Sequence, residues 1–257
     1  MDHHLVSFLP LAPAIRFWDC KGGLSELALE GEASVVFSAE KYCMGYNDGE
    51  KMHKCPVHME GSKQCAACAA RDISRVYTRL DYSGFERFYE KFKNQAFSVY
   101  LVSFGHIVKC GVTRTPRLLE RVAEQGADYY CELAKAEDAE TAYSIETLVQ
   151  GNFAVRNGLT SAQKMKLIGA AALPGRLEDT LGKVRESGIL EGFEGEMKVR
   201  TLEYAVPASF SPADNIEGEI CGNKGQILFF EKEGQHYGVN MSKKSGTKFD
   251  YSSRTGS

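Results

Sequence analysis

The sequence predicts an α+β protein in which a central α/β domain is inserted between an N-terminal and a C-terminal β segment. Three observations predict it. Short apolar runs broken by Gly and Pro occupy both ends of the 257-residue chain, strand-like and helix-like runs alternate in its middle, and a cysteine-rich loop precedes that middle part. We expect four segments: an N-terminal β segment at 1–41, the cysteine-rich loop at 42–71, the α/β domain at 72–192, and a C-terminal β segment at 193–257.

The two β segments are predicted from their short apolar runs. The clearest runs are 27–29 and 35–37 near the N-terminus, and 202–206, 227–230 and 237–239 near the C-terminus. Glycines separate the later runs, as expected of turns. Since a lone hairpin is only marginally stable in water, we expect the segments 193–257 and 1–41 to pack together.

Composition favours an ordinary globular protein, with 43% hydrophobic and 25% charged residues and a net charge of −3. No apolar stretch approaches the roughly 18 residues that a membrane span needs. The N-terminus, Met1 to His4, lacks the positively charged start of a signal peptide. We therefore expect a cytoplasmic protein with no membrane partner, in which the eight cysteines are thiols or metal ligands rather than disulfides.

Four of the cysteines lie within the loop at 42–71. They are Cys43, Cys55, Cys65 and Cys68. The two-residue spacing of the last pair lets both thiolates reach one tetrahedral ion. The loop has no hydrophobic periodicity, so a metal would supply its folding energy. We predict a structural Zn²⁺ knuckle with these four ligands, and His53 and His58 remain alternative ligands.

The middle domain begins with two strand-like runs at 97–103 and 107–112, which read as a hairpin around Gly105-His106. A basic helix is predicted over 116–125, with Pro116 in its first turn and Gly126 just past its end. A third strand at 127–133 follows. Helices are then predicted over 138–153, 161–172 and 175–187 from their apolar spacing and capping residues.

The hairpin and basic helix resemble the core of the GIY-YIG nuclease superfamily. Ser98-Val99-Tyr100 stands where that superfamily has Gly-Ile-Tyr, and Lys109-Cys110-Gly111 stands where it has Tyr-Ile-Gly. The order strand, strand, helix, strand, helix is also similar. The resemblance implies a functional Arg on the first helix, which is Arg117 or Arg121, and a metal-holding Glu on the later helix, which is Glu146.

The resemblance implies a different catalytic role for each of these residues. The Tyr100 hydroxyl would orient or deprotonate the attacking water, and an Arg fork would neutralise charge on the phosphate. Glu146 would hold Mg²⁺ or Mn²⁺. Lys109 replaces the second tyrosine, so it would either activate water through a lowered pKa or pair with a phosphate.

The whole chain also resembles an uncharacterised family, domain-of-unknown-function family 2797, which implies no activity. That resemblance rests on the cysteine knuckle, on Tyr100 to Thr113, on the stretch from Arg121 to Ala127, and on the Gly-x-Lys-Gly-Gln pattern at 222–226.

Three functional hypotheses follow. The first is a metal-dependent nucleic-acid phosphodiester hydrolase with a structural zinc site. The second is a nucleic-acid-binding protein that keeps the fold without catalysis, and the third is a zinc-stabilised interaction module. Residues 71–126 carry ten basic and six acidic side chains, and this local positive charge favours the first two. The replacement at Lys109 favours the second over the first. DNA and RNA are not distinguished.

Overall fold

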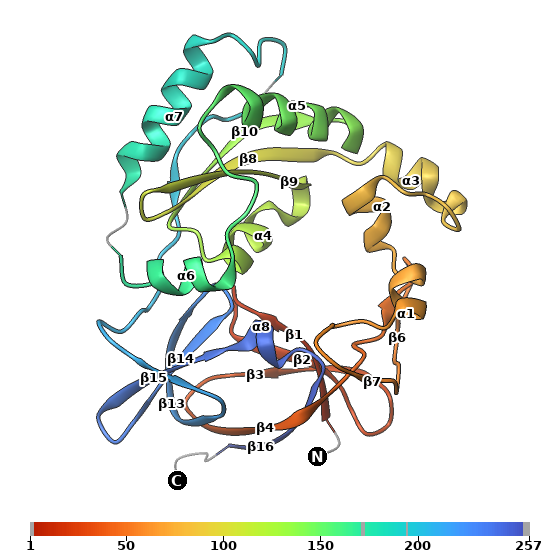
Figure 1. The fold of residues 1–257 in the computed structure, drawn as a ribbon, viewed down its shortest axis with the longest axis vertical. Coiled ribbons are helices and arrows are strands. Elements are labelled where there is room, and N and C mark those ends of the chain that lie inside the picture. The colour runs from red at the N-terminus through yellow and green to blue at the C-terminus, as the bar shows by residue number, and fades with distance from the viewer. Residues whose placement is uncertain (1–2, 171–172, 194, 254–257) are drawn as a thin grey trace. The chain divides into compact units, whose positions relative to one another are not determined.

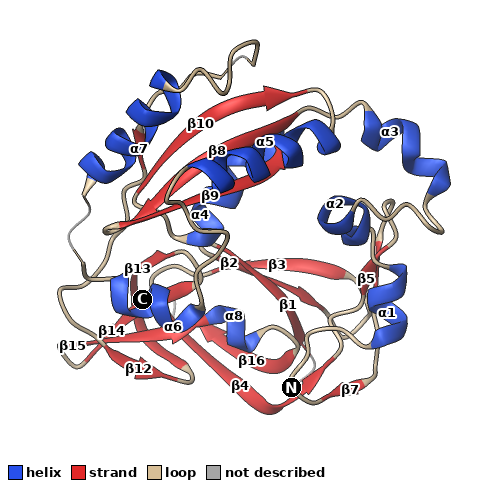
Figure 2. Ribbon diagram, turned by 45° about the horizontal axis from the view of Figure 1, so that its top comes forward, coloured by secondary structure: helices blue, strands red, loops and turns tan. Residues whose placement is uncertain are grey.

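The computed structural model describes residues 3–170, 173–193 and 195–253 (Figure 1). These residues form both helices and strands (Figure 2), which confirms the predicted α+β class. The chain divides into two compact units. The first unit combines residues 1–85 with 204–257, and the second unit is residues 86–203.

Strands from both ends of the chain form one ten-stranded sheet in the first unit (Figure 1). The sheet order is β12-β15-β14-β13-β4-β16-β1-β2-β3, and β7 also pairs with β4. The N-terminal strands are β1 (His3–Leu9), β2 (Ala14–Trp18), β3 (Leu24–Ala28) and β4 (Glu32–Tyr42). The C-terminal elements are β12 (Ser211–Ala213), β13 (Ile216–Lys224), β14 (Ile227–Lys232), β15 (Gln235–Asn240), the short helix α8 (Met241–Lys244) and β16 (Thr247–Ser253).

Strand β4 joins the two ends because its side chains alternate between core and solvent. Ala33, Val35 and Phe37 are buried on one face, as the period of a strand requires. Val35 pairs with Ile216 of β13, and Phe37 pairs with Phe249 of β16. All five of these apolar side chains belong to one hydrophobic core.

Phe249 lies in the aromatic part of that core. Its side chain is fully buried. The ring meets Phe17 edge-on at 5.4 Å between centroids, and it packs against Phe37 at 6.2 Å in a tilted arrangement. Edge-to-face aromatic pairs of this kind add stability beyond the area they bury. The C-terminal strand therefore completes a core that the N-terminal strands leave open.

Short elements lead from the sheet through the cysteine-rich region. They are β5 (Tyr46–Asn47), β6 (Met52–His53), β7 (His58–Met59), α1 (Ala66–Arg71) and α2 (Ser74–Arg79). Strands β5 and β6 form a separate two-stranded ladder. This region is held mainly by turns, caps and side-chain hydrogen bonds, as the lack of hydrophobic periodicity indicates.

The second unit is built on a four-stranded sheet with the order β11-β10-β8-β9. Every residue of the inner strand β8 is buried, and α5 and α7 both pack on β8, β9 and β10. Its elements are η1 (Glu86–Phe88), α3 (Tyr89–Lys93), β8 (Phe97–Phe104), β9 (Ile107–Arg114), η2 (Thr115–Arg117), α4 (Leu118–Gln125), β10 (Tyr129–Ala136), α5 (Ala139–Asn152), α6 (Ser161–Leu167), α7 (Pro174–Glu186) and β11 (Arg200–Thr201).

Two expected elements differ from the structure. The strand predicted at 202–206 is wrong, because only Arg200 and Thr201 pair with β10 and the chain then runs without regular structure. The helix expected over 161–172 ends at Leu167, and a turn follows it. Residues 171–172 of that expectation lie outside the described residues. None of the helices in the described part of the chain combines the length and the apolar character needed to cross a membrane.

The role of Phe249 can be tested through stability. Replacing it with Ala leaves a cavity where the two ends of the chain meet, so we expect Phe249→Ala to lower the free energy of unfolding by about 3–5 kcal/mol. Urea unfolding followed by tryptophan fluorescence measures this, since the single tryptophan, Trp18, is buried in the same unit. Val36→Ala is the matched control, because Val36 lies on the exposed face of β4. Equal losses in both variants would contradict the packing described.

Candidate functional site

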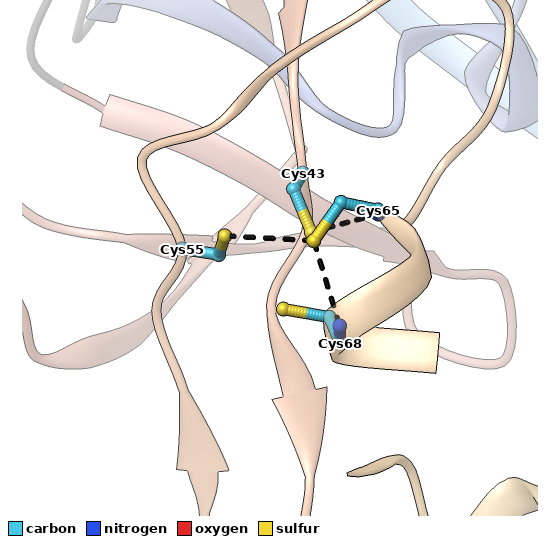
Figure 3. Close-up of side chains that lie close together, drawn as sticks. All are labelled: Cys43, Cys55, Cys65 and Cys68. Carbon is cyan, nitrogen blue, oxygen red and sulfur yellow. Dashed lines mark hydrogen bonds between the residues drawn. The ribbon is translucent and has the colours of Figure 1, made fainter. Parts of the chain in front are cut away.

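The four loop cysteines come together from three separate parts of the first unit (Figure 3). Cys43 directly follows β4, and Cys55 lies between β6 and β7. Cys65 is the N-cap of α1, and Cys68 lies within that helix. Cys43 and Cys68 are buried, whereas Cys55 and Cys65 are partly exposed. The predicted set of four is therefore gathered at one place.

The sulfur spacing is that of a metal site. All four sulfur atoms lie within 4.8 Å of one another, and the Sγ atoms of Cys55 and Cys65 are 4.0 Å apart. Four thiolates around one tetrahedral zinc ion, with Zn–S bonds of about 2.3 Å, have their sulfurs about 3.8 Å apart. The cluster could thus hold a single tetrahedral ion after only small adjustments.

Backbone N–H groups point at the sulfurs and favour their charged form. The N–H of Cys65 donates to Cys43 Sγ at 3.3 Å, and the N–H of Cys68 donates to Cys65 Sγ at 3.5 Å. The bond from Cys68 lowers the pKa of Cys65 to about 7. Burial raises the pKa of Cys43 and that of Cys68. A bound cation would therefore have to displace protons from buried thiols, as thiolate sites generally do.

Asp72 and Gln64 fix the loops that carry the cysteines. Gln64 Nε2 donates to Asp72 Oδ2 at 2.8 Å and to the carbonyl of Gly45 at 2.7 Å. The same Asp72 oxygen accepts from the backbone N–H of Asn47 at 3.1 Å. Gly45 adopts φ +86°, and a Cβ there would lie 1.8 Å from the carbonyl oxygen of His53, so no other residue fits. Sequence reasoning missed this support, because it depends on contacts across the loop.

The two histidines considered as ligands have other partners. His53 Nε2 contacts Asp48 Oδ2 at 2.7 Å, and its ring stacks on Tyr46 at 4.6 Å between centroids. His58 is exposed and meets the edge of Tyr42 at 5.6 Å. Neither belongs to the sulfur cluster. The donor set assembled here therefore consists of thiols alone.

A second polar cluster lies in the second unit around the Tyr100 hydroxyl. Tyr100 is only 1% exposed, and its hydroxyl accepts a hydrogen bond of 2.6 Å from Gln125 Nε2. The Lys109 ammonium donates to Gln125 Oε1 at 2.9 Å. Strand register places Tyr100 opposite Gly111, where a Cβ would lie 2.7 Å from the tyrosine ring and hydroxyl. The glycine therefore makes room for the tyrosine.

Of the two candidate arginines, Arg121 is the one that interacts with Tyr100. The Arg121 guanidinium lowers the pKa of the Tyr100 hydroxyl, against the rise that burial causes, and it also pairs with Glu124 at 3.0 Å. Arg117 pairs instead with Glu120 and Glu124, each at 2.9 Å. Arg117, at the end of η2, is thus paired with two acidic side chains of α4, while Arg121 acts on Tyr100.

The carboxyl group of Glu146 on α5 interacts electrostatically with the charged groups of this cluster. Burial raises the pKa of its carboxyl group, and the Lys109 ammonium acts against that rise. Burial lowers the pKa of Lys109, and the charge of Arg121 lowers it further. Tyr100, Lys109, Arg121 and Glu146 therefore influence one another although they come from β8, β9, α4 and α5.

Sequence reasoning missed two members of the cluster, Gln125 and Lys164. Gln125 lies four residues after Arg121 and so shares its helix face, which is a signal that the sequence does contain. Lys164 of α6 donates to the backbone carbonyl of Gln125 at 2.9 Å, and burial lowers its pKa to about 8. No local pattern links α6 to α4, so Lys164 could be found only from the fold.

Comparison with known proteins gives a family but no activity. No match was found among curated proteins or among solved structures. Residues 32–249 match the model of a family described as protein of unknown function (DUF2797), and this range includes the cysteine cluster and the Tyr100 cluster. Because the match spans most of the chain, the protein belongs to the DUF2797 family.

Proposed function

We propose that the protein is a metal-dependent nucleic-acid phosphodiester hydrolase whose chemistry lies in the second unit and whose first unit holds a structural zinc ion. One observation carries the proposal: a tyrosine, a lysine, an arginine and a glutamate come from four different elements and interact around Tyr100. These are the residue types that phosphodiester hydrolysis needs for water activation, charge neutralisation and metal binding.

The order of elements supports the resemblance to the GIY-YIG superfamily. Strand β8 carries Ser98-Val99-Tyr100 and pairs with β9, which carries Lys109-Cys110-Gly111. Helix α4 with Arg121, strand β10 and helix α5 with Glu146 then follow in the expected sequence. The close fit of Tyr100 against Gly111 gives a physical reason for a glycine in the second motif.

Each side chain would have a distinct task. The guanidinium of Arg121 is planar and always charged, which suits it to a phosphate. Its positive charge acts on the Tyr100 hydroxyl, so the group that would bind phosphate lies near the hydroxyl that would orient water. Lys109 would supply a second positive charge from the other side of Gln125.

Glu146 is the residue that would hold the catalytic ion. Mg²⁺ retains several waters and is commonly bound through only one or two carboxylates, so a single glutamate is an adequate donor set. When bound, the ion would supply a Lewis acid for the phosphate and a more acidic water. The Lys109 ammonium favours the ionised form of Glu146, which is the form that binds a cation.

The cysteine cluster would have a structural role. Four thiolates close the coordination sphere of zinc and leave no open position for substrate. The ion would replace the missing hydrophobic core of the loop between β4 and α2.

Zinc content tests this part of the proposal. We expect one equivalent of zinc per purified chain by elemental analysis, with the four loop thiols protected from titration. Cys65→Ser should lose most of the metal and melt the first unit at a lower temperature, since one ligand is removed. Cys20→Ser is the control, because Cys20 is an exposed cysteine outside the cluster. Less than half an equivalent of zinc with freely titratable loop thiols would refute the site.

Cleavage assays with Mg²⁺ or Mn²⁺ on single-stranded, duplex and branched nucleic acids test the catalytic part. We expect Glu146→Gln to abolish cleavage while leaving substrate binding nearly unchanged, because the carboxylate would hold the ion and the basic groups would hold phosphate. Tyr100→Phe should slow cleavage by roughly 10²-fold, the usual effect of losing a positioned proton-transfer group. Glu140→Gln, at an exposed position of the same helix, is the control. Undiminished cleavage by Glu146→Gln would show that the assignment is wrong.

Binding without hydrolysis is the second candidate, and the burial of Tyr100 favours it. The hydroxyl already has partners and is shielded from solvent, and Lys109 stands in place of the second tyrosine. Binding should then weaken steeply with salt, because each neutralised phosphate releases counterions. Arg121→Ala should reduce both the affinity and the salt slope in a filter-binding titration. Affinity that does not change between low and physiological ionic strength would argue against any phosphate-binding surface.

A further inference from the structure

Two basic side chains that the proposed reaction does not use, Arg156 and Lys164, lie near Lys109 in the second unit. Lys164 belongs to α6, and Arg156 lies in the segment that connects α5 to α6. All three residues fall within the same compact unit, 86–203. Backbone and side-chain hydrogen bonds fix where the two additional cations stand relative to Lys109.

Arg156 extends the edge of the four-stranded sheet beside Lys109. Strand β9 is the last in the order β11-β10-β8-β9, and residue 156 forms a parallel bridge with residue 109. The Arg156 N–H donates to the carbonyl of Val108 at 3.0 Å, and the Arg156 carbonyl accepts from the N–H of Cys110 at 3.2 Å. Residues paired across neighbouring strands direct their side chains to the same face of a sheet. The exposed Arg156 side chain therefore starts next to that of Lys109.

Lys164 reaches the same region from α6 through Gln125. Its ammonium donates to the backbone carbonyl of Gln125 at 2.9 Å, and the Lys109 ammonium donates to the side-chain oxygen of the same glutamine at 2.9 Å. The Lys164 ammonium also lies 5.2 Å from the centroid of the Phe104 ring, which is within cation–π range. A single buried glutamine thus separates two ammonium groups that come from different elements.

The hydrogen bonds to Gln125 leave the charges of these cations uncompensated. Among the described residues, no acidic side chain forms an ion pair with any of the three. Glu146 acts on Lys109 electrostatically without such a contact, and Glu124 already pairs with the arginines of η2 and α4. Lys109 and Lys164 are half-buried, and a charge that is partly removed from water normally has a partner. An anionic ligand would supply that partner.

We propose that Lys109, Arg156 and Lys164 bind backbone phosphates of a nucleic-acid strand next to the phosphate held at the reaction centre. The inference rests on the proposed function for the position of that reacting phosphate. Phosphate oxygens accept hydrogen bonds from ammonium and guanidinium groups whatever the base sequence, so these side chains would position the strand without reading its bases. The substrate would then be a strand that continues beyond the cleaved bond rather than a single nucleotide.

Fluorescence anisotropy of the full-length, zinc-loaded protein with labelled oligonucleotides tests the proposal, with Ca²⁺ in place of Mg²⁺ to prevent cleavage. Lys164→Gln removes the charge but keeps a donor for the Gln125 carbonyl, so a purely structural lysine would tolerate the change. We expect this variant to bind about tenfold more weakly at low salt, the effect of losing one charge-assisted bond. The slope of log affinity against log salt should fall by about one. Lys166→Gln, at an exposed position of the same helix, is the matched control.

Arg156→Gln gives an independent measurement at a position where folding is not at stake. Among the described residues, the Arg156 side chain makes no hydrogen bond or ion pair whose loss would destabilise the unit. The variant should also lower the salt slope by about one, and the double variant with Lys164→Gln should lower it by about two, since each side chain would neutralise its own phosphate. Comparing DNA with RNA, each as single strand and duplex, identifies which nucleic acid these groups bind.

The pH dependence of binding distinguishes a phosphate contact at Lys164 from a remote effect. Burial and the charges of Lys109 and Arg121 lower the pKa of Lys164 to about 8, against the opposing charge of Glu124. A bound phosphate favours the charged lysine, so wild-type affinity should fall as the pH rises from about 7 to about 9. Lys164→Arg stays charged over this range and should show a smaller fall.

Two results would overturn the inference. One is wild-type affinity and wild-type salt slope in both Lys164→Gln and Arg156→Gln, and the other is the absence of wild-type binding to every nucleic acid tested at low salt. The first result leaves hydrolysis intact if cleavage still depends on Glu146. Conversely, reduced salt slopes in a protein that never cleaves would support the phosphate contacts and refute the hydrolase.

Discussion

The pairing of β4 with strands from the far end of the chain is the constraint on which the first unit depends. Val35 lies opposite Ile216, and Phe37 lies opposite Phe249, so the core forms only after the C-terminal residues have returned to the sheet. The entropic cost of closing a loop grows only slowly with the length of the loop. Residues 86–203, which lie between the two parts of the sheet in the sequence, can therefore form a compact unit of their own. Their length adds little to the entropic cost of bringing the strands of the sheet together.

The cysteine cluster depends on the same strand. Cys43 follows its last residue, and β7, which pairs with the end of β4, follows Cys55. The strand thus brings two of the four sulfurs together, and α1 supplies the other two as cap and first-turn residue. Between these anchors the loop has few buried apolar side chains. Its order comes from polar contacts such as those of Asp72, and a metal ion held by the four sulfurs would add to it.

Local patterns predicted the parts of this structure that local interactions determine. The strands at 97–103 and 107–112 and the helix at 116–125 correspond to β8, β9 and η2 with α4, because Gly105, Pro116 and Gly126 mark their ends. The cysteine set was predictable from the Cys65-x-x-Cys68 spacing. The prediction of a strand at 202–206 was wrong because this segment has no partner strand, and no local sequence pattern shows whether a partner is present. The contribution of Lys164 arises from long-range packing, and the nuclease resemblance itself stays a prediction.

The two clusters differ in how far the protein alone satisfies them. Around Tyr100, one amide meets two needs, because Gln125 donates Nε2–H to the tyrosine hydroxyl and accepts the Lys109 ammonium through Oε1. The reversed amide would place its NH₂ against a cation and its oxygen against the hydroxyl, so the orientation is fixed by charge. A side chain that donates is therefore required at position 109, and lysine meets that requirement. The polar groups of this cluster therefore satisfy one another within the protein. The sulfur cluster brings four thiols within 4.8 Å of one another, and one bound metal ion could satisfy all four at once.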